Sequence, residues 1–434
     1  MKPIKKLNCP LFLGCLFLLI LYFNIAFCMD VQYYGSFVVR FVENKFRKDN
    51  PLNPDFKVFD LPERESKIYL NLFMNLYFNE NFGFTLKTRP TWIKKGNKEM
   101  GKNYLDNAYL NFNLGKGLFL SMGKENLIRG VGFSYYPSDF FSEKKEIDFT
   151  LKEEEQRSDR EGNYIIRSEL LLENVTLTTV IAPEIDNLQE ENTRAEFKFS
   201  TLLYDTDLSI SYFHSNYGRI GFNISRVVGQ KFEVHSGLGV RFDSDRKYLR
   251  KKGEIGLPGS GIFEYEIYEP EDEEKVFLRG LIGGHYTSVN KTNYIVEYFY
   301  NQDGYDGNEW KEFFTIIKDN NNKLMSPPNG FSEDLFKFNL SLANSLMTYR
   351  YLRRHYLFVR VWNPEIYNKF GVTCGILLNL EDKSFVILPT VDYKLIRDFM
   401  MLRFGAAVFK GDGESEFGLS PMKNYYYFET RIFF

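Results

Sequence analysis

The chain has 434 residues, a formal net charge of −2 and aromatic side chains at 17% of its positions. This charge gives no basic footprint for nucleic acid, and four isolated histidines without a CxxC pair argue against a structural zinc site. The 43 Phe and 29 Tyr far exceed what a soluble core of this size usually contains.

The first 28 residues have the pattern of a secretory signal peptide. Three lysines within the first six residues precede an apolar run from Leu11 to Phe27, and a basic region followed by an apolar one is typical of exported chains. We expect cleavage after Cys28, which leaves residues 29–434 as one mature domain. A lipid on Cys28 is disfavoured by the bulky Phe27 before it. An uncleaved anchor is the other alternative, because the run approaches the roughly 20 residues of a membrane helix.

Along the mature chain, apolar and polar residues alternate with a period of two. The clearest case is Lys67–Phe78, where Ile68 and every second residue after it are apolar while the other phase carries Lys67, Asn71 and Asn75. Lipid on one face and water on the other account for such strands. Two girdles of aromatic residues at the membrane interfaces would accommodate the many rings.

Connector lengths indicate a barrel with two different ends. Short turns are expected at Asn79–Asn81, Gly115–Gly117, Glu173–Val175 and Tyr204–Asp207, and long polar connectors at Glu43–Glu65, Asn126–Asn163, Asp243–Lys275, Gln302–Asp334 and Gly411–Asn424. This asymmetry is typical of outer-membrane barrels, whose strand number is even. Glu333–Met347 is either a short helix within a loop, which gives 18 strands, or another strand; 16 strands fit nearly as well.

We therefore predict an all-β fold, a transmembrane antiparallel up-and-down β-barrel of about 16–18 strands. The alternative is a pair of soluble β-sandwich domains, which no linker or change in composition supports. A closed barrel also leaves no sheet edge exposed.

The segment Gly123–Asp139 contains three glycines and closes on a Pro-x-Asp motif. It resembles a stretch in several porin-like barrels, among them relatives of the alginate-export type, where such a segment precedes a loop that folds over or into the pore. Asn379–Ser384 and Ser415–Gly418 look similar to the closing strands of that group. If the segment only shapes a loop, its charged residues have no further role. The constriction residues that the resemblance implies are Lys124, Arg129 and Asp139.

If the apolar face of each strand contacts lipid, the opposite face lines the lumen, and basic residues outnumber acidic ones there. An arginine-rich wall suits anionic solutes, because guanidinium binds carboxylate and phosphate in a bidentate fork. The alternative is that the arginines pair with glutamates and brace the barrel. The predicted pore-lining residues are Arg167, Arg194, Arg219, Arg241, Arg279, Arg360, Arg403, Glu233 and Glu297.

We predict no catalytic group, no cofactor and no metal. The nearest catalytic candidate is Glu233-Val-His235-Ser236, but alternation places His235 and Ser236 on opposite faces, which rules out the hydrogen bond of a nucleophile and its base. The oxygens of Asp303–Glu309 lack the spacing of an EF-hand loop. A plug domain would need roughly a hundred residues before the barrel, whereas strand-like alternation begins at Tyr33.

The last ten residues, Tyr425–Phe434, carry Phe428, Ile432 and Phe434 on one face and Glu429 with Arg431 on the other. A terminal strand of this kind resembles the last strand of Gram-negative outer-membrane barrels, which the barrel-assembly machinery recognises; an ordinary amphipathic edge strand is the alternative. The resemblance implies the outer membrane as location. It implies membrane lipid, lipopolysaccharide, the assembly machinery and small solutes as partners, with no nucleic acid.

From these features we expect a porin-like channel for passive passage of small solutes, with anions favoured by the arginine wall. The alternative is a non-conducting barrel whose long loops act in surface adhesion or envelope assembly. The aromatic residues in the lumen phase, which could occlude the lumen, keep that alternative open: Phe73, Tyr77 and Phe119.

Overall fold

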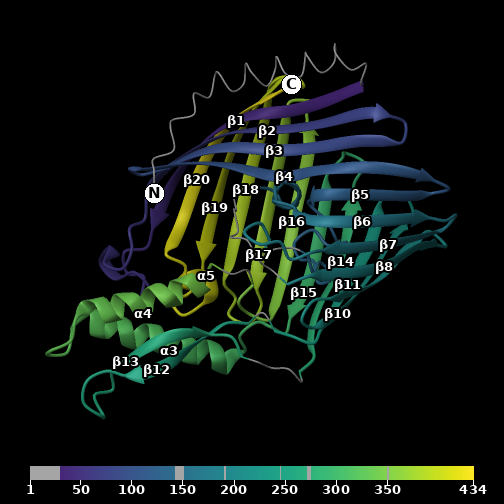
Figure 1. Ribbon diagram of the computed structural model, residues 1–434. Helices are drawn as coiled ribbons and strands as arrows, with labels where there is room; N and C mark the ends of the chain where they lie inside the picture. The colour runs from purple at the N-terminus through teal and green to yellow at the C-terminus, as the bar shows by residue number, and fades with distance from the viewer. Residues whose placement is uncertain (1–29, 142–150, 190–191, 245, 271–274, 349–350) are drawn as a thin grey trace.

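The computed structural model describes residues 30–141, 151–189, 192–244, 246–270, 275–348 and 351–434. Eighteen strands form one antiparallel sheet that closes on itself, because β1 (Asp30–Phe46) pairs with both β2 (Arg64–Asn79) and β20 (Met422–Phe433) (Figure 1). Each barrel strand pairs with the next along the chain, and β11 pairs with β14 across an inserted hairpin. The predicted all-β up-and-down barrel is confirmed with 18 strands. The predicted signal peptide lies outside the described residues.

The other barrel strands are β3 (Phe82–Lys95), β4 (Lys98–Gly115), β5 (Leu118–Glu125), β6 (Asn163–Leu171), β7 (Val175–Ala182), β8 (Arg194–Leu203), β9 (Thr206–His214), β10 (Gly218–Val228), β11 (Phe232–Arg241), β14 (Phe277–Thr287), β15 (Asn293–Asn301), β16 (His355–Ile366), β17 (Phe370–Asn379), β18 (Phe385–Ile396) and β19 (Met400–Lys410). The connectors contain η1 (Pro54–Phe56), α2 (Glu153–Ser158), β12 (Tyr248–Glu254), β13 (Phe263–Tyr268), α3 (Gly307–Met325), α4 (Glu333–Leu346) and α5 (Glu416–Leu419).

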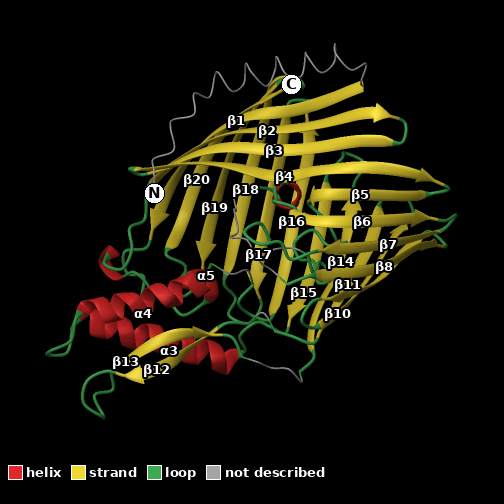
Figure 2. Ribbon diagram, in the orientation of Figure 1, coloured by secondary structure: helices red, strands yellow, loops and turns green. Residues whose placement is uncertain are grey.

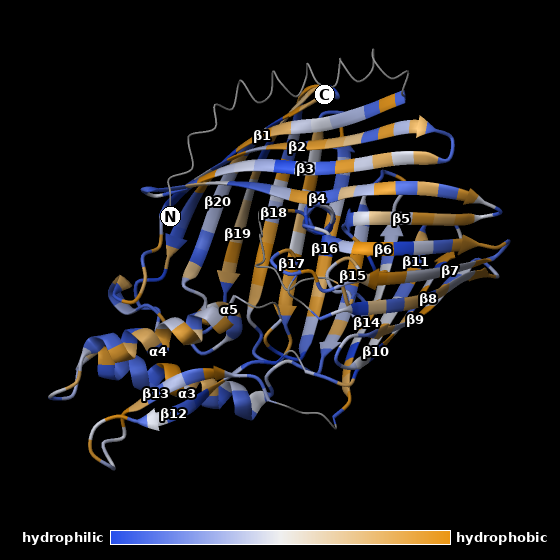
Figure 3. Ribbon diagram, viewed as in Figure 1, coloured by the Kyte–Doolittle hydropathy of each residue, from blue (hydrophilic) through white to orange (hydrophobic). Residues whose placement is uncertain are grey.

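The strands expose apolar side chains and bury polar ones, the reverse of a soluble protein. On β10, Phe222 is 41% exposed while its neighbour Asn223 is 6% exposed. On β15, Val296 is 48% exposed and Glu297 is fully buried. Figure 3 shows hydrophobic and hydrophilic residues alternating along many of the strands. Period-two alternation with the polar face inward gives the barrel an apolar outer surface and a polar inner wall.

The two ends of the barrel differ. The connections β2–β3, β4–β5, β6–β7 and β8–β9 are tight turns at the end where the backbones of Phe434 and Gly35 pair; we call it the turn end. The long connectors lie at the opposite end, the loop end. Three connectors there, at 96–97, 215–217 and 380–384, are nevertheless short. Helix α4 occupies most of Glu333–Met347, so this segment is a helix within a loop and not another strand.

Beyond the loop end, β12, β13, α3 and α4 pack together into a unit that we call the cap (Figures 1 and 2). Its apolar core includes Trp310, Phe313 and Leu340 and extends to Leu52 and Leu419 of two other connectors. The N-cap residue of α3 is Asp306, whose carboxylate accepts hydrogen bonds from two backbone N–H groups of the first turn. Among the described helices, none combines the length and the apolar character needed to cross a bilayer.

Candidate functional site: the inner wall and the loop inside the barrel

The connector between β5 and β6 runs into the barrel. Figure 2 shows its short helix α2 between the barrel walls. The described part of this connector, residues 126–141 and 151–162, is called the inner loop below. Its side chains reach strands on opposite sides of the barrel, from Lys87 on β3 to Arg360 on β16. The resemblance of Gly123–Asp139 predicts a loop that folds over or into the pore, and the described part of this connector enters the barrel.

The first anchor of the inner loop is Glu297 on β15. This buried carboxylate accepts hydrogen bonds from the backbone N–H groups of Phe133 (2.7 Å) and Ser134 (2.8 Å) and from Ser134 Oγ (2.5 Å). Its other neighbour is His235 Nε2 at 2.8 Å. Glu297, predicted to line the pore, therefore holds the inner loop against β15.

The second anchor is the acidic first turn of α2. Arg360 on β16 lies 3.0 Å from the carboxylate of Glu153 and 2.7 Å from that of Glu154. Arg403 and Arg431 each lie 2.9 Å from the carboxylate of Glu155. Acidic residues also suit the N-terminus of a helix. Two predicted pore-lining arginines, Arg360 and Arg403, thus face carboxylates of the inner loop.

The third anchor depends on small residues of β10 and β11. A Cβ added at Gly239 would lie 2.1 Å from the carbonyl oxygen of Pro137, and one at Gly221 would lie 2.8 Å from Ser138 Cβ. Ser138 Oγ donates to Asn223 Oδ1 at 2.8 Å. These glycines let the backbone of the inner loop lie directly against the wall.

The three predicted constriction residues lie at the base or on the path of the inner loop. Each makes an ion pair: Lys124 with Glu161 at 3.6 Å, Arg129 with Glu196 at 3.0 Å, and Asp139 with Arg160 at 3.3 Å. Their contacts hold the loop to the wall and to itself.

Arg219, Arg241 and Arg279 gather near the loop end. Arg241 lies 3.1 Å from Asp243, which also pairs with Arg219, and Arg279 lies 2.6 Å from Asp303. The two carboxylates come from the connectors that follow β11 and β15. Asp303 is the first residue of the segment Asp303–Glu309, which lacks the spacing of an EF-hand loop, and its carboxylate pairs with the guanidinium of Arg279.

Two further pore-lining candidates, Arg194 and Glu233, have polar or aromatic neighbours on the inner wall. Arg194 donates to Asn163 Oδ1 at 2.9 Å and lies 5.7 Å from the centre of the Phe141 ring. Glu233 accepts from Ser225 Oγ at 2.9 Å and has His235 Nδ1 3.8 Å away.

His235 and Ser236 occupy opposite faces of β11, as their alternation predicted. The His235 ring is buried inside the barrel, where it meets Glu297. Ser236 Oγ instead donates to the carbonyl oxygen of Leu281 at 2.8 Å. The two side chains do not form a nucleophile–base pair.

A cavity of about 310 Å³ opens at the turn end of the inner wall, over β2 to β6. Arg167 at its edge pairs with Glu125 at 2.9 Å and with Glu169 at 2.6 Å. The lining combines aromatic rings with amide, hydroxyl and charged groups, among them Asn75, Tyr77, Thr85, Asn111, Phe119 and Arg167.

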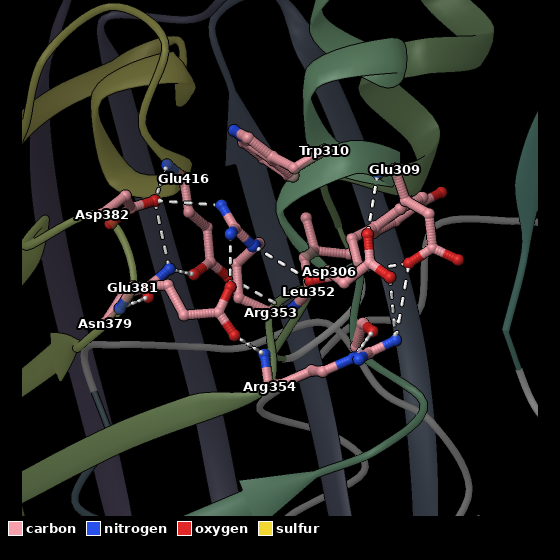
Figure 4. A network of polar contacts seen from close by, with 12 residues as sticks. Asp306, Glu309, Trp310, Leu352, Arg353, Arg354, Asn379, Glu381, Asp382 and Glu416 are labelled. Carbon is pink, nitrogen blue, oxygen red and sulfur yellow. Dashed lines mark hydrogen bonds and ion pairs between the residues drawn. The ribbon is translucent and has the colours of Figure 1, made fainter.

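At the loop end, a buried polar network joins α5 to the barrel rim (Figure 4). The Glu416 carboxylate accepts from Tyr356 Oη (2.8 Å), Asn379 Nδ2 (2.8 Å) and the backbone N–H of Leu352 (3.1 Å). The backbone N–H of Glu416 donates to Asp382 Oδ2 at 2.8 Å. Burial raises the pKa of Glu416 to about 7.

The same network reaches the cap. Arg353 pairs with Glu381 and lies 5.2 Å from the centre of the Trp310 ring of α3, and Arg354 lies 3.3 Å from Asp306. Figure 4 shows these side chains converging between the β17–β18 connector, α3 and α5. The cap is therefore tied to the rim by charged as well as apolar contacts.

Sequence reasoning missed Glu153–Glu155 as partners of the wall. The signal was present, because the acidic run follows the Gly-x-Gly turn within one connector of a barrel whose inner face is rich in arginine. The glycines of β10 and β11 gave a second signal, since glycine within a strand often marks close approach of another backbone.

The sequence matches no protein-family model and no curated protein. Its fold is similar to those of solved outer-membrane porins. OccK11 (OpdR) of Pseudomonas aeruginosa has a TM-score of 0.53 at 10% identity, with 93% of this chain and 96% of that chain covered. OccAB1 of Acinetobacter baumannii has a TM-score of 0.52 at 9% identity, with 93% and 96% covered. OccAB3 of that organism has 0.50 at 11% identity, with 93% and 99% covered. At these identities the likeness concerns the fold, which is that of an outer-membrane porin barrel.

Proposed function

We propose that the protein is an outer-membrane channel for passive passage of small solutes. The observation that carries the proposal is the inner loop, which leaves β5, turns into the barrel and is fixed to the wall by Glu297, Arg360 and Arg403. A polar lumen narrowed by an anchored loop selects solutes by size and charge. An apolar outer surface supports placement of the barrel in the outer membrane.

A preference for anions is a separate proposal, supported by the arginines of the inner wall. Many of these arginines have carboxylate partners, such as Glu155 for Arg403 and Asp303 for Arg279. Pairing reduces the field that a passing ion meets, so we expect the preference to be weak.

The test is single-channel conductance of the refolded mature protein in planar bilayers, with a salt gradient across the membrane. Discrete steps with a reversal potential slightly toward the anion are expected. Discrete steps with cation preference would remove the anion proposal and leave the channel. A folded, heat-modifiable barrel that never conducts would refute the channel itself.

The second candidate is a non-conducting barrel that acts in surface adhesion or envelope assembly. The cap favours it, because four long-connector elements share an apolar core with Trp310 and Phe336 and present a folded surface at the loop end. Absence of conductance together with loss of cell attachment on removal of the cap would favour this candidate over the channel.

The proposed partners follow from the same placement. Membrane lipid and lipopolysaccharide would surround the apolar surface, and the barrel-assembly machinery would bind Tyr425–Phe434. Kinship with the alginate-export type rests on the motifs of Gly123–Asp139 and is part of this proposal. The inner wall offers solute contacts, and we propose no enzymatic reaction.

A further inference from the structure

We propose that the cavity at the turn end is a binding subsite for neutral, hydroxylated ring compounds, that is, sugars. The inference deepens the proposed channel function, on which the passage of the sugar rests. The cavity holds about 310 Å³, which is the lower end of the size range of small-molecule sites. Its lining supplies the two kinds of contact that a sugar ring needs.

The first contact is an apolar platform. Tyr77 is 41% exposed and Phe119 is 37% exposed, and both belong to the inner-wall phase of their strands. Phe119 lies directly opposite Asn113 and Glu169 on the two neighbouring strands. A ring that remains open to a water-filled space offers its face to an apolar partner, and the C–H face of a pyranose provides one.

The second contact is a row of three hydrogen-bonded side chains that has a donor at one end and an acceptor at the other. Asn111 Nδ2 donates to Thr85 Oγ1 at 3.0 Å, and Thr85 Oγ1 donates to Asn75 Oδ1 at 2.9 Å. In the described part of the chain, no partner is recorded for the amide nitrogen of Asn75 or the amide oxygen of Asn111. The row thus ends in one donor and one acceptor. A hydroxyl group both donates and accepts, so adjacent hydroxyls of a sugar match this pair.

The charges of the subsite favour a neutral ligand. Arg167 is held by Glu125 and Glu169 at 2.9 and 2.6 Å. Two carboxylates beside one guanidinium leave no net positive charge for an anionic solute, so carboxylated solutes are disfavoured here. The side chain of Glu169 is 29% exposed at the edge of the cavity, where its carboxylate can accept from a hydroxyl group.

The experiment measures maltose and gluconate on the same protein. Isothermal titration of the detergent-refolded barrel reports binding, and maltose-induced interruptions of single-channel current report binding during passage. We expect maltose to bind more tightly than gluconate. Phe119→Ala should weaken maltose binding roughly tenfold, because loss of one stacking contact costs about 1.4 kcal/mol. Phe119→Trp should retain binding.

The matched control is Tyr204→Ala, which removes an aromatic ring that is 85% exposed in the β8–β9 turn and should leave maltose binding unchanged. Conductance without maltose binding, or gluconate binding as tightly as maltose, would overturn the sugar subsite and leave the channel intact. Maltose binding without conductance would support the subsite and refute the channel. Equal binding by Phe119→Ala and the wild type would also overturn the proposal.

Discussion

At the scale of single residues, the carboxyl group of Glu416 is harder to ionise than usual because it is buried. Its oxygens accept three kinds of donor, from Tyr356, Asn379 and the backbone of Leu352, but no cation is among these partners. Asp382 lies beside it and receives its backbone N–H. Desolvation outweighs these hydrogen bonds, which is why the pKa of Glu416 rises to about 7 from 4.5.

We predict that α5 loosens as the pH rises from about 4.5 to 7. Because the pKa of Glu416 is higher in the folded state, its contribution to stability is fully present below about pH 4.5 and is lost between pH 4.5 and 7. Limited proteolysis of the β19–β20 connector should therefore be slower at pH 5 than at pH 8. Glu416→Gln should flatten this dependence, and Glu254→Gln on the exposed cap hairpin should retain it. The same pH profile in wild type and Glu416→Gln would contradict the assignment.

At the scale of elements, α2 is stabilised mainly by what it contacts. A helix of six residues is marginal on its own in water. Three carboxylates in its first turn meet Arg360, Arg403 and Arg431 on three strands, and Arg157 near its end donates to the carbonyl oxygen of Arg129 at 2.6 Å. The helix is thus held on one side by the wall and on the other by the start of its own loop.

Changing Glu153, Glu154 and Glu155 together to Gln should loosen the inner loop and take a carboxylate partner from each of three arginines. Arg360 loses both Glu153 and Glu154, whereas Arg403 keeps Asp392 and Arg431 keeps Glu429. We expect larger single-channel conductance and a reversal potential shifted toward the anion, because removing one side of an ion pair leaves the other charge uncompensated. Glu264→Gln on the cap hairpin is the control for loss of a loop carboxylate. Conductance and selectivity equal to the wild type would show that α2 does not narrow the pathway.

At the scale of the whole molecule, barrel closure depends on the seam between β1 and β20. Arg40 and Glu429 lie opposite each other across this seam and form a buried ion pair, 1% and 0% exposed. Arg431 adds a contact to the same carboxylate at 2.8 Å. First and last strands of the chain therefore meet through charges inside the barrel and through backbone pairing.

Glu429→Ala should lower the free energy of unfolding by about 3–5 kcal/mol, because it removes the carboxylate that neutralises the buried guanidinium of Arg40. Replacing both Arg40 and Glu429 by Met should cost less than the single change. Glu43→Gln, which removes an exposed pair with Lys45 on the same strand, should change the free energy of unfolding by less than about 0.5 kcal/mol. Denaturant titration in detergent measures all three. A double variant less stable than Glu429→Ala would contradict this account.

The sequence by itself determined the barrel. Strands in which every second residue is apolar, repeated along the whole chain, fit few structures other than a closed sheet in lipid. In Lys67–Phe78 and Tyr425–Phe434 the sequence shows an apolar face and a polar face. The connector lengths predicted that the barrel has one end with short turns and one with long loops. Helix periodicity in Glu333–Met347 was too short to separate a helix from a strand, so its packing in the cap decided it.

Only the tertiary structure decided which charges meet. Alternation places Arg360 and Arg403 inside the barrel, but their carboxylate partners in Glu153–Glu155 come from more than 200 positions away along the chain. No local pattern encodes such a pairing, because the path of a long connector is set by what its side chains find on the wall. The strand faces are local properties of the sequence, whereas the anchored loop inside the barrel depends on contacts distant in the sequence.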